Sequence, residues 1–241
     1  MKPIIKKMLS LVVITTLFSS CGVEMFNGIN GNRNVVTKNR TPNADFSKIK
    51  VSTGLDLEIS QGIENKIVLE ADENLHELIF TEVENGVLKI YAEKSIWKAA
   101  SKKVFVTVKN LNEISATSGA FVTNETIFKT DTLSVIATSG AEINFSVEAN
   151  SIITVATSGA DLKIAGKTKA HNSNATSGAS IRAKSLESET VVANVTSGAE
   201  IDIFASESIN ATATSGGDID YAGNPKKSTK KTTSGGSISG N

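Results

Sequence analysis

Hydrophobic and polar residues alternate along the second half of the chain in units that recur about every nineteen residues. The tripeptide Thr-Ser-Gly marks each unit. It occurs seven times, with successive spacings of 21, 19, 19, 20, 18 and 19 residues, at Thr117, Thr138, Thr157, Thr176, Thr196, Thr214 and Thr233. Alternation with period two predicts strands with one buried face, and a fixed period of this size indicates a solenoid whose units cover one another's buried faces.

Aligning the units shows which side chains face the core. The third residue after each Gly is aliphatic in every unit: Val122, Ile143, Leu162, Ile181, Ile201, Ile219 and Ile238. Val, Ile, Thr, Ser and Gly favour strands and turns over helix, so each unit is predicted to hold two strands joined by the Thr-Ser-Gly turn, where Gly supplies the positive φ. The expected fold is all-β, a parallel β-helix, and the rule for parallel crossovers favours a right-handed coil.

The region before the repeats also has strand patterns. Residues 46–60 and 103–109 alternate, and residues 79–91 carry Asn85-Gly86 between two alternating runs, which predicts a hairpin. Residues 72–78 are expected to form one helical turn. A single domain is therefore predicted over 43–241, with N-terminal strands in 43–110 and the repeat units in 111–241, where the tail after Tyr221 forms a fraying last unit.

The first 21 residues are typical of a lipoprotein signal. Three lysines precede an apolar stretch of eleven residues, which is too short to span a bilayer, and Phe18-Ser19-Ser20-Cys21 resembles a bacterial lipobox. We expect residues 1–20 to be removed, Cys21 to be lipidated as a membrane anchor, and residues 21–42, rich in Asn and Gly, to form a flexible tether. Ordinary signal cleavage beside an incidental Cys is the alternative.

The order of several segments resembles a known family. These segments are Gly28-Ile29-Asn30, VVTKNR (35–40), FSKIKVSTGLDLEISQG (46–62), ADENL (71–75), ENGVLKIY (84–91) and YAGNPKK (221–227). With the Thr-Ser-Gly units, they resemble the head GIN domain family, bacterial envelope proteins of unknown function that are described as autotransporter adhesins. The resemblance implies a right-handed β-helix and an envelope location, and it brings no catalytic residues. Gly22 rather than Asp after Cys21, by analogy with enteric bacteria, favours the outer membrane. The family usually carries Ser-Gly-Ser-Gly turns, whereas five of the seven turns here read Thr-Ser-Gly-Ala.

The composition of the chain argues against several classes of function. Lys plus Arg equals Asp plus Glu at 25 each, so no overall basic field exists to hold a nucleic acid, and none is expected as a partner. One Cys excludes a disulfide framework, and two His leave little for a metal site or a catalytic triad. No cofactor is expected. The chain contains 28 Ser and 24 Thr but only 5% aromatic residues.

Acidic side chains form the first candidate site. Glu142, Asp161, Glu200 and Asp218 occupy one outward position on neighbouring units, where a bound cation such as Ca²⁺ would relieve their mutual repulsion. Ser180 interrupts this acidic column, and the calcium-binding nonapeptide repeat is absent. A solvated acidic stripe is therefore the favoured interpretation.

Hydroxyl and aromatic groups form the second set of candidates. The Thr and Ser of each turn, such as Thr138 and Ser139 or Thr157 and Ser158, would stack into a ladder able to bind a sugar, although satisfying the turn backbone is their simpler role. Trp97, near Lys94 and Lys98, could stack on a sugar ring or cap the core.

The two histidines are not expected to be catalytic. His171 stands where other units carry Leu, Ile or Val, and a partly buried or edge histidine is the favoured interpretation. His76 is predicted to lie in a surface turn.

Three functions remain open at this stage. A non-enzymatic, lipid-anchored adhesin that binds a cell-surface glycan or protein is favoured over a polysaccharide-active enzyme, because the unit spacings leave no inserts to build a cleft and Arg182 is the only Arg in the units. A purely structural envelope protein is the third.

Overall fold

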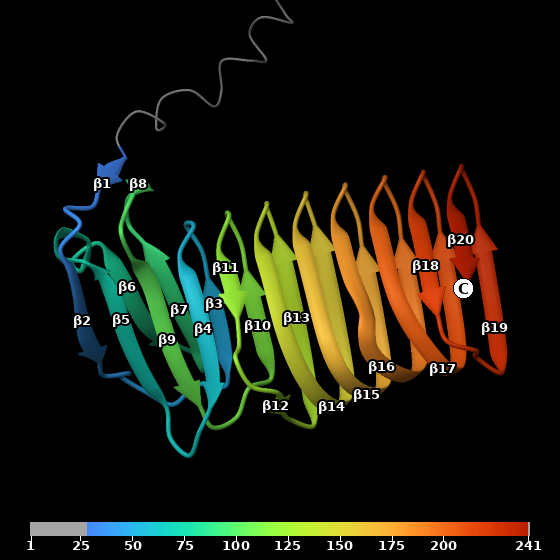
Figure 1. Cartoon of the computed structure of the whole chain (residues 1–241), viewed down its shortest axis with the longest axis horizontal. Coiled ribbons are helices and arrows are strands. Elements are labelled where there is room, and N and C mark those ends of the chain that lie inside the picture. The colour runs from blue at the N-terminus through green and yellow to red at the C-terminus, as the bar shows by residue number, and fades with distance from the viewer. Residues whose placement is uncertain (1–27, 241) are drawn as a thin grey trace, which may run out of the picture.

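The computed structural model describes residues 28–240, and their parallel strands stack into one elongated β-solenoid (Figure 1). Residues 1–20 and Cys21, the predicted signal and lipidation site, lie outside the described residues. The repeat units form β10 (Glu113–Ala116), β11 (Phe121–Thr123), β12 (Phe128–Lys129), β13 (Thr132–Thr138), β14 (Glu142–Thr157), β15 (Asp161–Ala175), β16 (Ser180–Val195), β17 (Glu200–Ala213), β18 (Asp218–Ala222), β19 (Lys227–Thr232) and β20 (Ser237–Gly240).

Each coil of the solenoid consists of a leading strand segment, a bend, a trailing strand segment and a Thr-Ser-Gly turn. Strands β14 to β17 run through the bend without a break, so their first halves form a leading sheet and their second halves a trailing sheet. The turns lie along one edge and the bends along the other (Figure 1). All neighbouring coils pair in parallel, so the parallel β-helix predicted from the repeat is confirmed.

The turns hold two consecutive residues in the left-handed region. The Ser residues have φ between 50° and 57°, and the Gly residues between 68° and 77°. In one example the Ala141 N–H donates to the Thr138 carbonyl at 3.2 Å, and the Gly140 N–H donates to the Ser158 carbonyl of the next turn at 3.2 Å. Two positive φ values define a type I′ turn, which here joins the trailing strand of one coil to the leading strand of the next. Positive φ was expected for Gly alone; Ser shares it because hydrogen bonds between turns offset the strain.

The core is a set of stacked columns of inward side chains. Ile143 pairs with Leu162 and Leu162 with Ile181, and all three are buried, as the alternation predicts. Beside the turns the core is narrow and holds alanines, with Val195 as an exception. A Cβ at position 217 would lie 2.9 Å from Val195 Cγ1. Gly217 therefore stands where the earlier coils carry Ala120, Ala141, Ala160, Ala179 and Ala199.

The N-terminal strands stack in an order that differs from the chain order. β3 (Lys48–Val51) and β4 (Asp56–Gln61) form a coil that pairs with β10 and β11 on one side. On its other side it pairs with β7 (Val87–Ala92) and β9 (Lys102–Val108). The coil of residues 48–61 is therefore inserted between residues 87–108 and the first repeat. Its Thr53 and Gly54 also have positive φ, and the Gly54 N–H donates to the Ser118 carbonyl at 3.0 Å.

Antiparallel strands close the N-terminal end of the core. β2 (Val35–Arg40) pairs with β5 (Lys66–Asp72), and β5 pairs with β9. β1 (Ile29–Asn30) pairs in parallel with β8 (Ile96–Lys98) as a separate two-stranded sheet. The prediction of a tether over residues 21–42 is therefore wrong for β1 and β2. Polar residues in 29–40 obscured these strands because strand pairing satisfies their backbone while most of their side chains face solvent.

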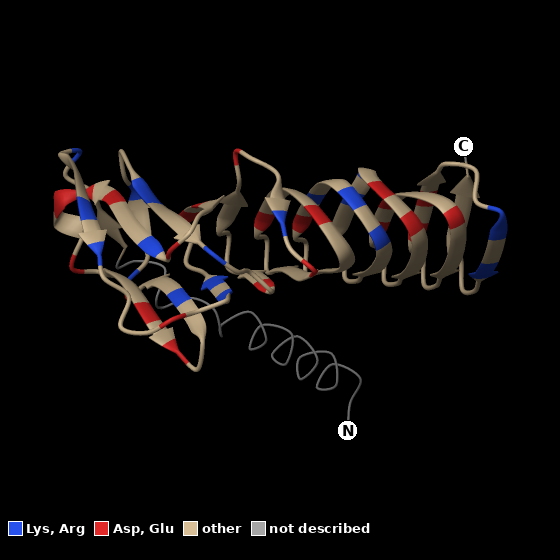
Figure 2. Ribbon diagram, turned by 90° about the horizontal axis from the view of Figure 1, so that it is seen from below, with Lys and Arg blue, Asp and Glu red and all other residues tan. Residues whose placement is uncertain are grey.

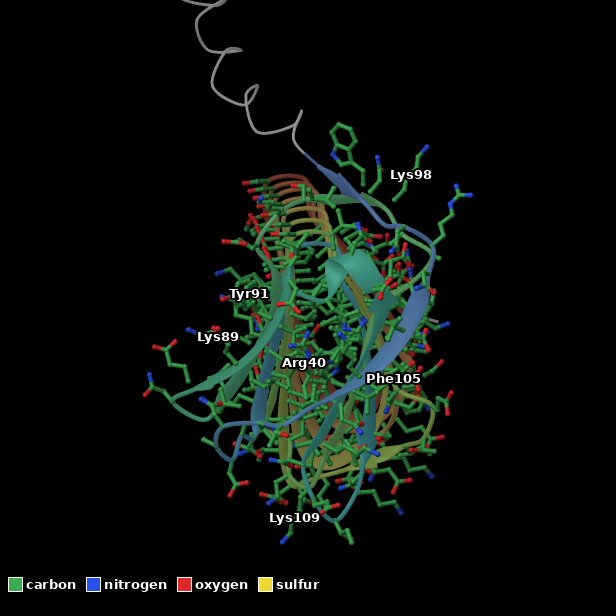
Figure 3. All side chains as sticks on the ribbon, turned by 90° about the vertical axis from the view of Figure 1, so that its left-hand side faces the viewer. Arg40, Lys89, Tyr91, Lys98, Phe105 and Lys109 are labelled. Carbon is green, nitrogen blue, oxygen red and sulfur yellow. The ribbon has the colours of Figure 1, made fainter. Side chains whose placement is uncertain are left out.

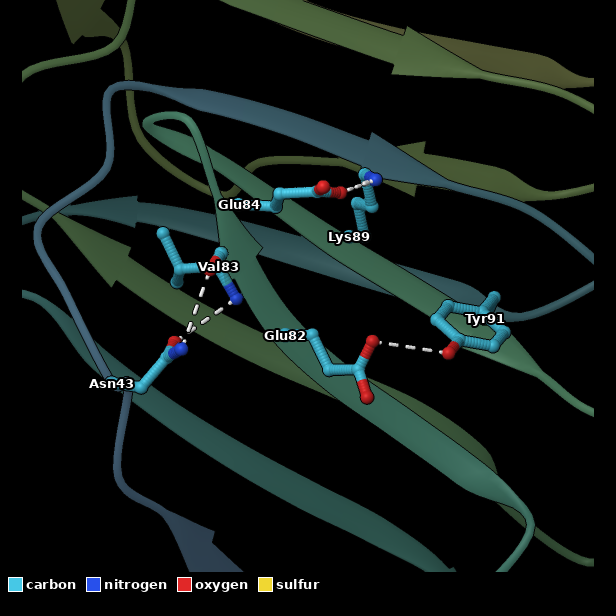
Figure 4. Close-up of polar contacts among 6 residues, drawn as sticks. All are labelled: Asn43, Glu82, Val83, Glu84, Lys89 and Tyr91. Atoms are coloured by element: carbon cyan, nitrogen blue, oxygen red, sulfur yellow. Dashed lines mark hydrogen bonds and ion pairs between the residues drawn. The ribbon is translucent and has the colours of Figure 1, made fainter.

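The predicted hairpin and helical turn are both present. β6 (Ile79–Glu84) pairs antiparallel with β7 through Asn85 and Gly86, which have φ of 52° and 74°. The turn η2 (Glu73–Leu75) precedes it. Side chains hold the hairpin together: Tyr91 donates to Glu82 at 3.1 Å, Lys89 pairs with Glu84, and the Asn43 amide bonds both backbone groups of Val83 (Figure 4).

The last described coil covers the core with polar groups. β19 and β20 pair with β17 and β18, so this tail is a formed coil rather than a frayed one. Its inward positions in β19 carry Ser228, Lys230 and Thr232, which pair with Ile209, Ala211 and Ala213 of the preceding coil. Lys230 Nζ lies 4.5 Å above the Tyr221 ring, so the end of the core is shielded without exposing an apolar surface.

Candidate binding surfaces

The predicted acidic column is present on the leading sheet. Glu142 pairs with Asp161, Asp161 with Ser180, Ser180 with Glu200, and Glu200 with Asp218. Arg182, two residues along the strand from the acidic column, approaches Asp161 to 2.6 Å, and Lys184 lies 3.0 Å from Asp202. Cations of neighbouring columns thus relieve part of the repulsion. Within residues 28–240 no group of three or more His, Cys, Asp or Glu side chains is placed to hold a metal ion.

Charged residues also follow the bends. Lys129 pairs with Glu148 and Lys167 with Glu187, each at 3.2 Å, around a hollow of about 770 Å³. Figure 2 shows these alternating charges along the bend edge of the solenoid and the lysines of β19 at its end. The pairs are exposed and neutralise one another, so this edge carries no strong net field.

The turn ladder places its hydroxyl groups in a regular row. Thr138 Oγ1 lies 3.4 Å from Ser139 Oγ, and Thr157 Oγ1 lies 3.4 Å from Ser158 Oγ. The Thr side chains are half-buried and the Ser side chains exposed. These two pairs thus bond side chain to side chain within their own turns. Within residues 28–240 none of the Thr-Ser-Gly hydroxyls bonds to the turn backbone, so the simpler role expected for them is not seen, and the remaining hydroxyl capacity of Ser faces solvent.

Over residues 132–212 the trailing sheet presents an outer surface without a charge, bordered by Glu113 of β10 on one side and by Lys227 and Lys231 of β19 on the other. We call it the neutral face; it comprises three outward residues on each of five coils. The leading sheet has nine charged side chains over residues 142–220, whereas the neutral face consists of Thr132, Ser134, Ile136, Ser151, Ile153, Val155, Ala170, Asn172, Asn174, Thr190, Val192, Asn194, Ser208, Asn210 and Thr212. Such depletion of charge is typical of the centre of a protein interface.

The neutral face combines apolar groups with ordered amides. Ile153 and Val192 are 43% and 42% exposed, so the face offers aliphatic surface to a partner. The Asn194 amide donates to Asn174 at 3.1 Å, and Asn174 donates to Asn172 at 3.0 Å. A hollow of about 320 Å³ joins this surface to the turns at Thr176 and Thr196. The surface can therefore make van der Waals contacts and hydrogen bonds with an uncharged partner.

Trp97 lies at the N-terminal end of the turn edge, far from the turns of the middle coils. It belongs to β8, is 53% exposed and does not cap the core. Arg33, Lys98 and Lys102 line the same depression. The predicted surface candidates thus fall into two groups that the structure does not bring together: Trp97 at one end, and the hydroxyl pairs along the ladder.

Both histidines are buried. His171 is 2% exposed and its Nε2 lies 2.9 Å from Thr154 Oγ1, while its Nδ1 has no partner among the described residues. Burial lowers the pKa of His171 to about 4. The predicted surface position of His76 is wrong: it is 1% exposed, and its Nε2 lies 3.0 Å from the Val36 carbonyl. β2, whose Val36 carbonyl contacts the ring, was not visible in the local sequence pattern.

Sequence reasoning missed the neutral face, although the signal was available. The inward columns identify the outward positions of every trailing strand, and those positions carry no Asp, Glu, Lys or Arg from residue 132 to residue 212. No helix in residues 28–240 is long and apolar enough to cross a membrane.

Comparison with known families gives one match that covers most of the chain. Residues 45–225 match the family described as "Putative auto-transporter adhesin, head GIN domain". No protein of curated function is similar in sequence to this chain.

Solved structures share the fold. The crystal structure of a "putative adhesin" from Bacteroides fragilis NCTC 9343 has a TM-score of 0.82 at 21% identity, covering 89% of this chain and 100% of that chain. A "putative lipid binding protein" from Parabacteroides distasonis ATCC 8503 has a TM-score of 0.74 at 20% identity, with coverage of 89% and 100%. A "putative adhesin" from Parabacteroides merdae ATCC 43184 has a TM-score of 0.67 at 21% identity, with coverage of 89% and 99%.

Proposed function

The chain belongs to the head GIN domain family, described as "Putative auto-transporter adhesin", and on this premise we propose that it is a non-enzymatic binding protein of the cell envelope. The observation that carries the proposal is the neutral face. Fifteen outward positions without a charge would be an unusual choice for a surface that meets only water, since 21% of the chain is charged. A flat, uncharged surface with exposed Ile, Val and Asn suits a flat, uncharged partner.

The proposed ligand is a glycan or protein on a cell surface. Regular parallel coils place equivalent side chains about 4.8 Å apart along the solenoid, so an extended partner would meet the same groups repeatedly. Weak contacts repeated over several coils can add up to useful affinity once the chain is held at a membrane.

A matched pair of substitutions tests the neutral face. Asn172→Lys puts a charge on the neutral face, and Asn144→Lys makes the same change at an exposed position of the leading sheet. We expect Asn172→Lys to weaken binding to intact cells, or to the glycans recognised on an array, by roughly tenfold or more, because a charge at an apolar contact must lose its water. Asn144→Lys should bind as the parent does.

Two results would contradict this proposal. One is equal binding by both variants. The other is a parent protein that recognises no glycan and whose deletion alters neither adhesion nor envelope integrity. Detectable depolymerisation of a uronate polymer would instead favour the enzyme.

We propose further that acylation of Cys21 anchors the protein in the outer membrane. The support is the lipobox-like segment before the sole Cys in the chain. Cys21→Ser is expected to abolish labelling by radioactive palmitate, because serine offers no thiol to acylate. The chain without its signal then carries no lipid and should leave the membrane fraction. Retention of an unlabelled parent protein in that fraction would refute the anchor.

A further inference from the structure

A basic depression with an exposed indole lies where the described chain begins. It is lined by Gly31, Arg33, Ile96, Trp97, Lys98, Ala99, Ala100 and Lys102, and has a volume of about 570 Å³. We call the side chains of Arg33, Trp97, Lys98 and Lys102 the Trp97 patch. Figure 3 shows Lys98 at the end of the molecule where the chain enters the solenoid.

The cations of the Trp97 patch form no direct ion pairs within residues 28–240. None of Arg33, Lys98 and Lys102 forms an ion pair there, and the lining of the depression contains no carboxylate. This contrasts with the bends, where Lys and Glu alternate. A cationic cluster of this kind attracts a surface of negative charge.

The nearest carboxylate beneath the patch is already engaged. Asp72 is buried and accepts hydrogen bonds of 2.9 to 3.2 Å from backbone N–H groups. Burial acts to raise the pKa of Asp72, but these donors outweigh burial and hold it below the ordinary value. The donors belong to Arg33, Ala100 and Ser101. Asp72 thereby fixes both segments that carry the patch. The Coulombic attraction of Arg33 also helps to lower the pKa of Asp72, so this carboxylate offsets part of the Arg33 charge, whereas Lys98 and Lys102 form no ion pair within residues 28–240.

Trp97 is held with one side against the backbone and the rest exposed. A Cβ on Gly28 would lie 2.0 Å from the indole Nε1, so the incoming chain packs directly on the ring. The Ile29 N–H donates to the Ser95 carbonyl at 2.8 Å and the Gly31 N–H to the Lys98 carbonyl at 2.7 Å, which fixes β8 beside the entering chain. An exposed Trp flanked by lysines is typical of side chains at the headgroup level of a membrane.

The length of the preceding chain limits how far this patch can be from the anchor. Seven residue steps separate Cys21 from Gly28. Even fully extended, they reach about 25 Å. If Cys21 is acylated, Gly28 and the indole on which it packs cannot leave the neighbourhood of the bilayer surface.

We propose that the Trp97 patch docks on the anionic headgroups of the membrane and so orients the solenoid relative to the bilayer. Arg33, Lys98 and Lys102 face phosphates, and Trp97 enters the headgroup layer. The inference rests on the proposed membrane anchoring, but the contact itself needs no acyl chain. Docking at one end leaves the neutral face of the later coils free for a partner.

Vesicle binding by the unacylated chain tests the inference. All described strands and core residues lie within 29–240, so a chain that begins at residue 22 retains the fold. We expect it to sediment with vesicles of phosphatidylethanolamine and phosphatidylglycerol but not with phosphatidylcholine alone, and to dissociate as ionic strength rises. Trp97 is the only Trp in the chain, so its emission should shift to the blue on binding.

Matched double variants locate the contact. Lys98→Ala/Lys102→Ala should weaken vesicle binding by more than about tenfold, and Trp97→Ala should weaken it without changing the salt dependence. Lys227→Ala/Lys231→Ala removes the same charge from β19 at the other end and should bind normally. Thermal unfolding identifies any variant that misfolds; Lys98→Glu, at an exposed position, then replaces it.

Several outcomes would overturn the inference. They are no sedimentation with the anionic vesicles, equal losses in the two double variants, and binding only to a soluble acidic polysaccharide. None of these affects the Asn172→Lys comparison or the palmitate labelling, so the failure of this inference is distinguishable from failure of the proposed function.

Discussion

Replacing Gly166 with alanine is expected to destabilise the solenoid by about 4 kcal/mol or more. Gly166 lies at the bend of β15, has φ of 122°, and pairs with Val147 of the preceding coil. A Cβ at this position would meet the Val147 carbonyl oxygen at 2.0 Å and its carbon at 2.8 Å. Both atoms are backbone, so neither can move aside by a change of rotamer, and the two coils would have to separate. Denaturant unfolding measured by circular dichroism gives the free energy difference.

Gly159→Ala is the control for this prediction. Gly159 also has a positive φ, 70°, but a Cβ there would meet nothing within 4 Å. Its cost is limited to the backbone conformation, about 1–2 kcal/mol. If Gly166→Ala lowered the free energy of unfolding no more than Gly159→Ala does, the coils would not approach each other closely at this bend.

Acid is expected to weaken the protein through His171. Burial lowers its pKa to about 4 in the folded chain, against 6.5 in the unfolded chain. The unfolded state therefore binds more protons between these values, so stability is complete above pH 6.5 and falls as the pH decreases. The loss due to this one residue should be about 2 kcal/mol at pH 5 and about 3 kcal/mol at pH 4.

The neighbours of His171 explain why a proton is costly there. Thr154 Oγ1 donates to Ser173 Oγ at 3.1 Å, so it accepts from Nε2–H of a neutral His171. Protonation would add an N–H at Nδ1, which has no acceptor within residues 28–240. The group lies in the core, where Ile152 and Val191 occupy the same column.

His171→Val isolates this contribution. The variant places an aliphatic side chain in an aliphatic column and should not show the loss of stability that protonation of His171 causes in acid. Protonation of carboxylates destabilises variant and parent alike, so it cancels in their difference. The stability difference between variant and parent should grow by about 3 kcal/mol from pH 7 to pH 4. A pH-independent difference would show that His171 titrates normally in the folded chain.

Much of the fold could be predicted because the repeat makes local information redundant. One strand with alternating residues is ambiguous, but an aliphatic column that recurs with Thr-Ser-Gly identifies the buried face in every coil. The hairpin at Asn85-Gly86 was equally accessible, since both positive φ values are a local requirement of the turn. His171 was recognised as a member of a core column by the same alignment.

The rest required contacts between distant residues. Residues 48–61 form a coil like the others, yet the sequence places them before the hairpin and the structure places them after it. Backbone hydrogen bonds between parallel strands are the same for every sequence, so the pattern of one strand does not say which strand lies beside it. The burial of His76 by β2 has the same origin.

The sequence by itself determined the period, the positions of the turns and the inward columns of this protein, because these depend on interactions within one unit or between similar neighbouring units. Only the tertiary structure decided the order of the N-terminal coils, the closure of the core by antiparallel strands, and the gathering of Arg33, Trp97, Lys98 and Lys102 around one depression. Those features depend on pairing between segments up to about seventy residues apart, which local alternation cannot encode.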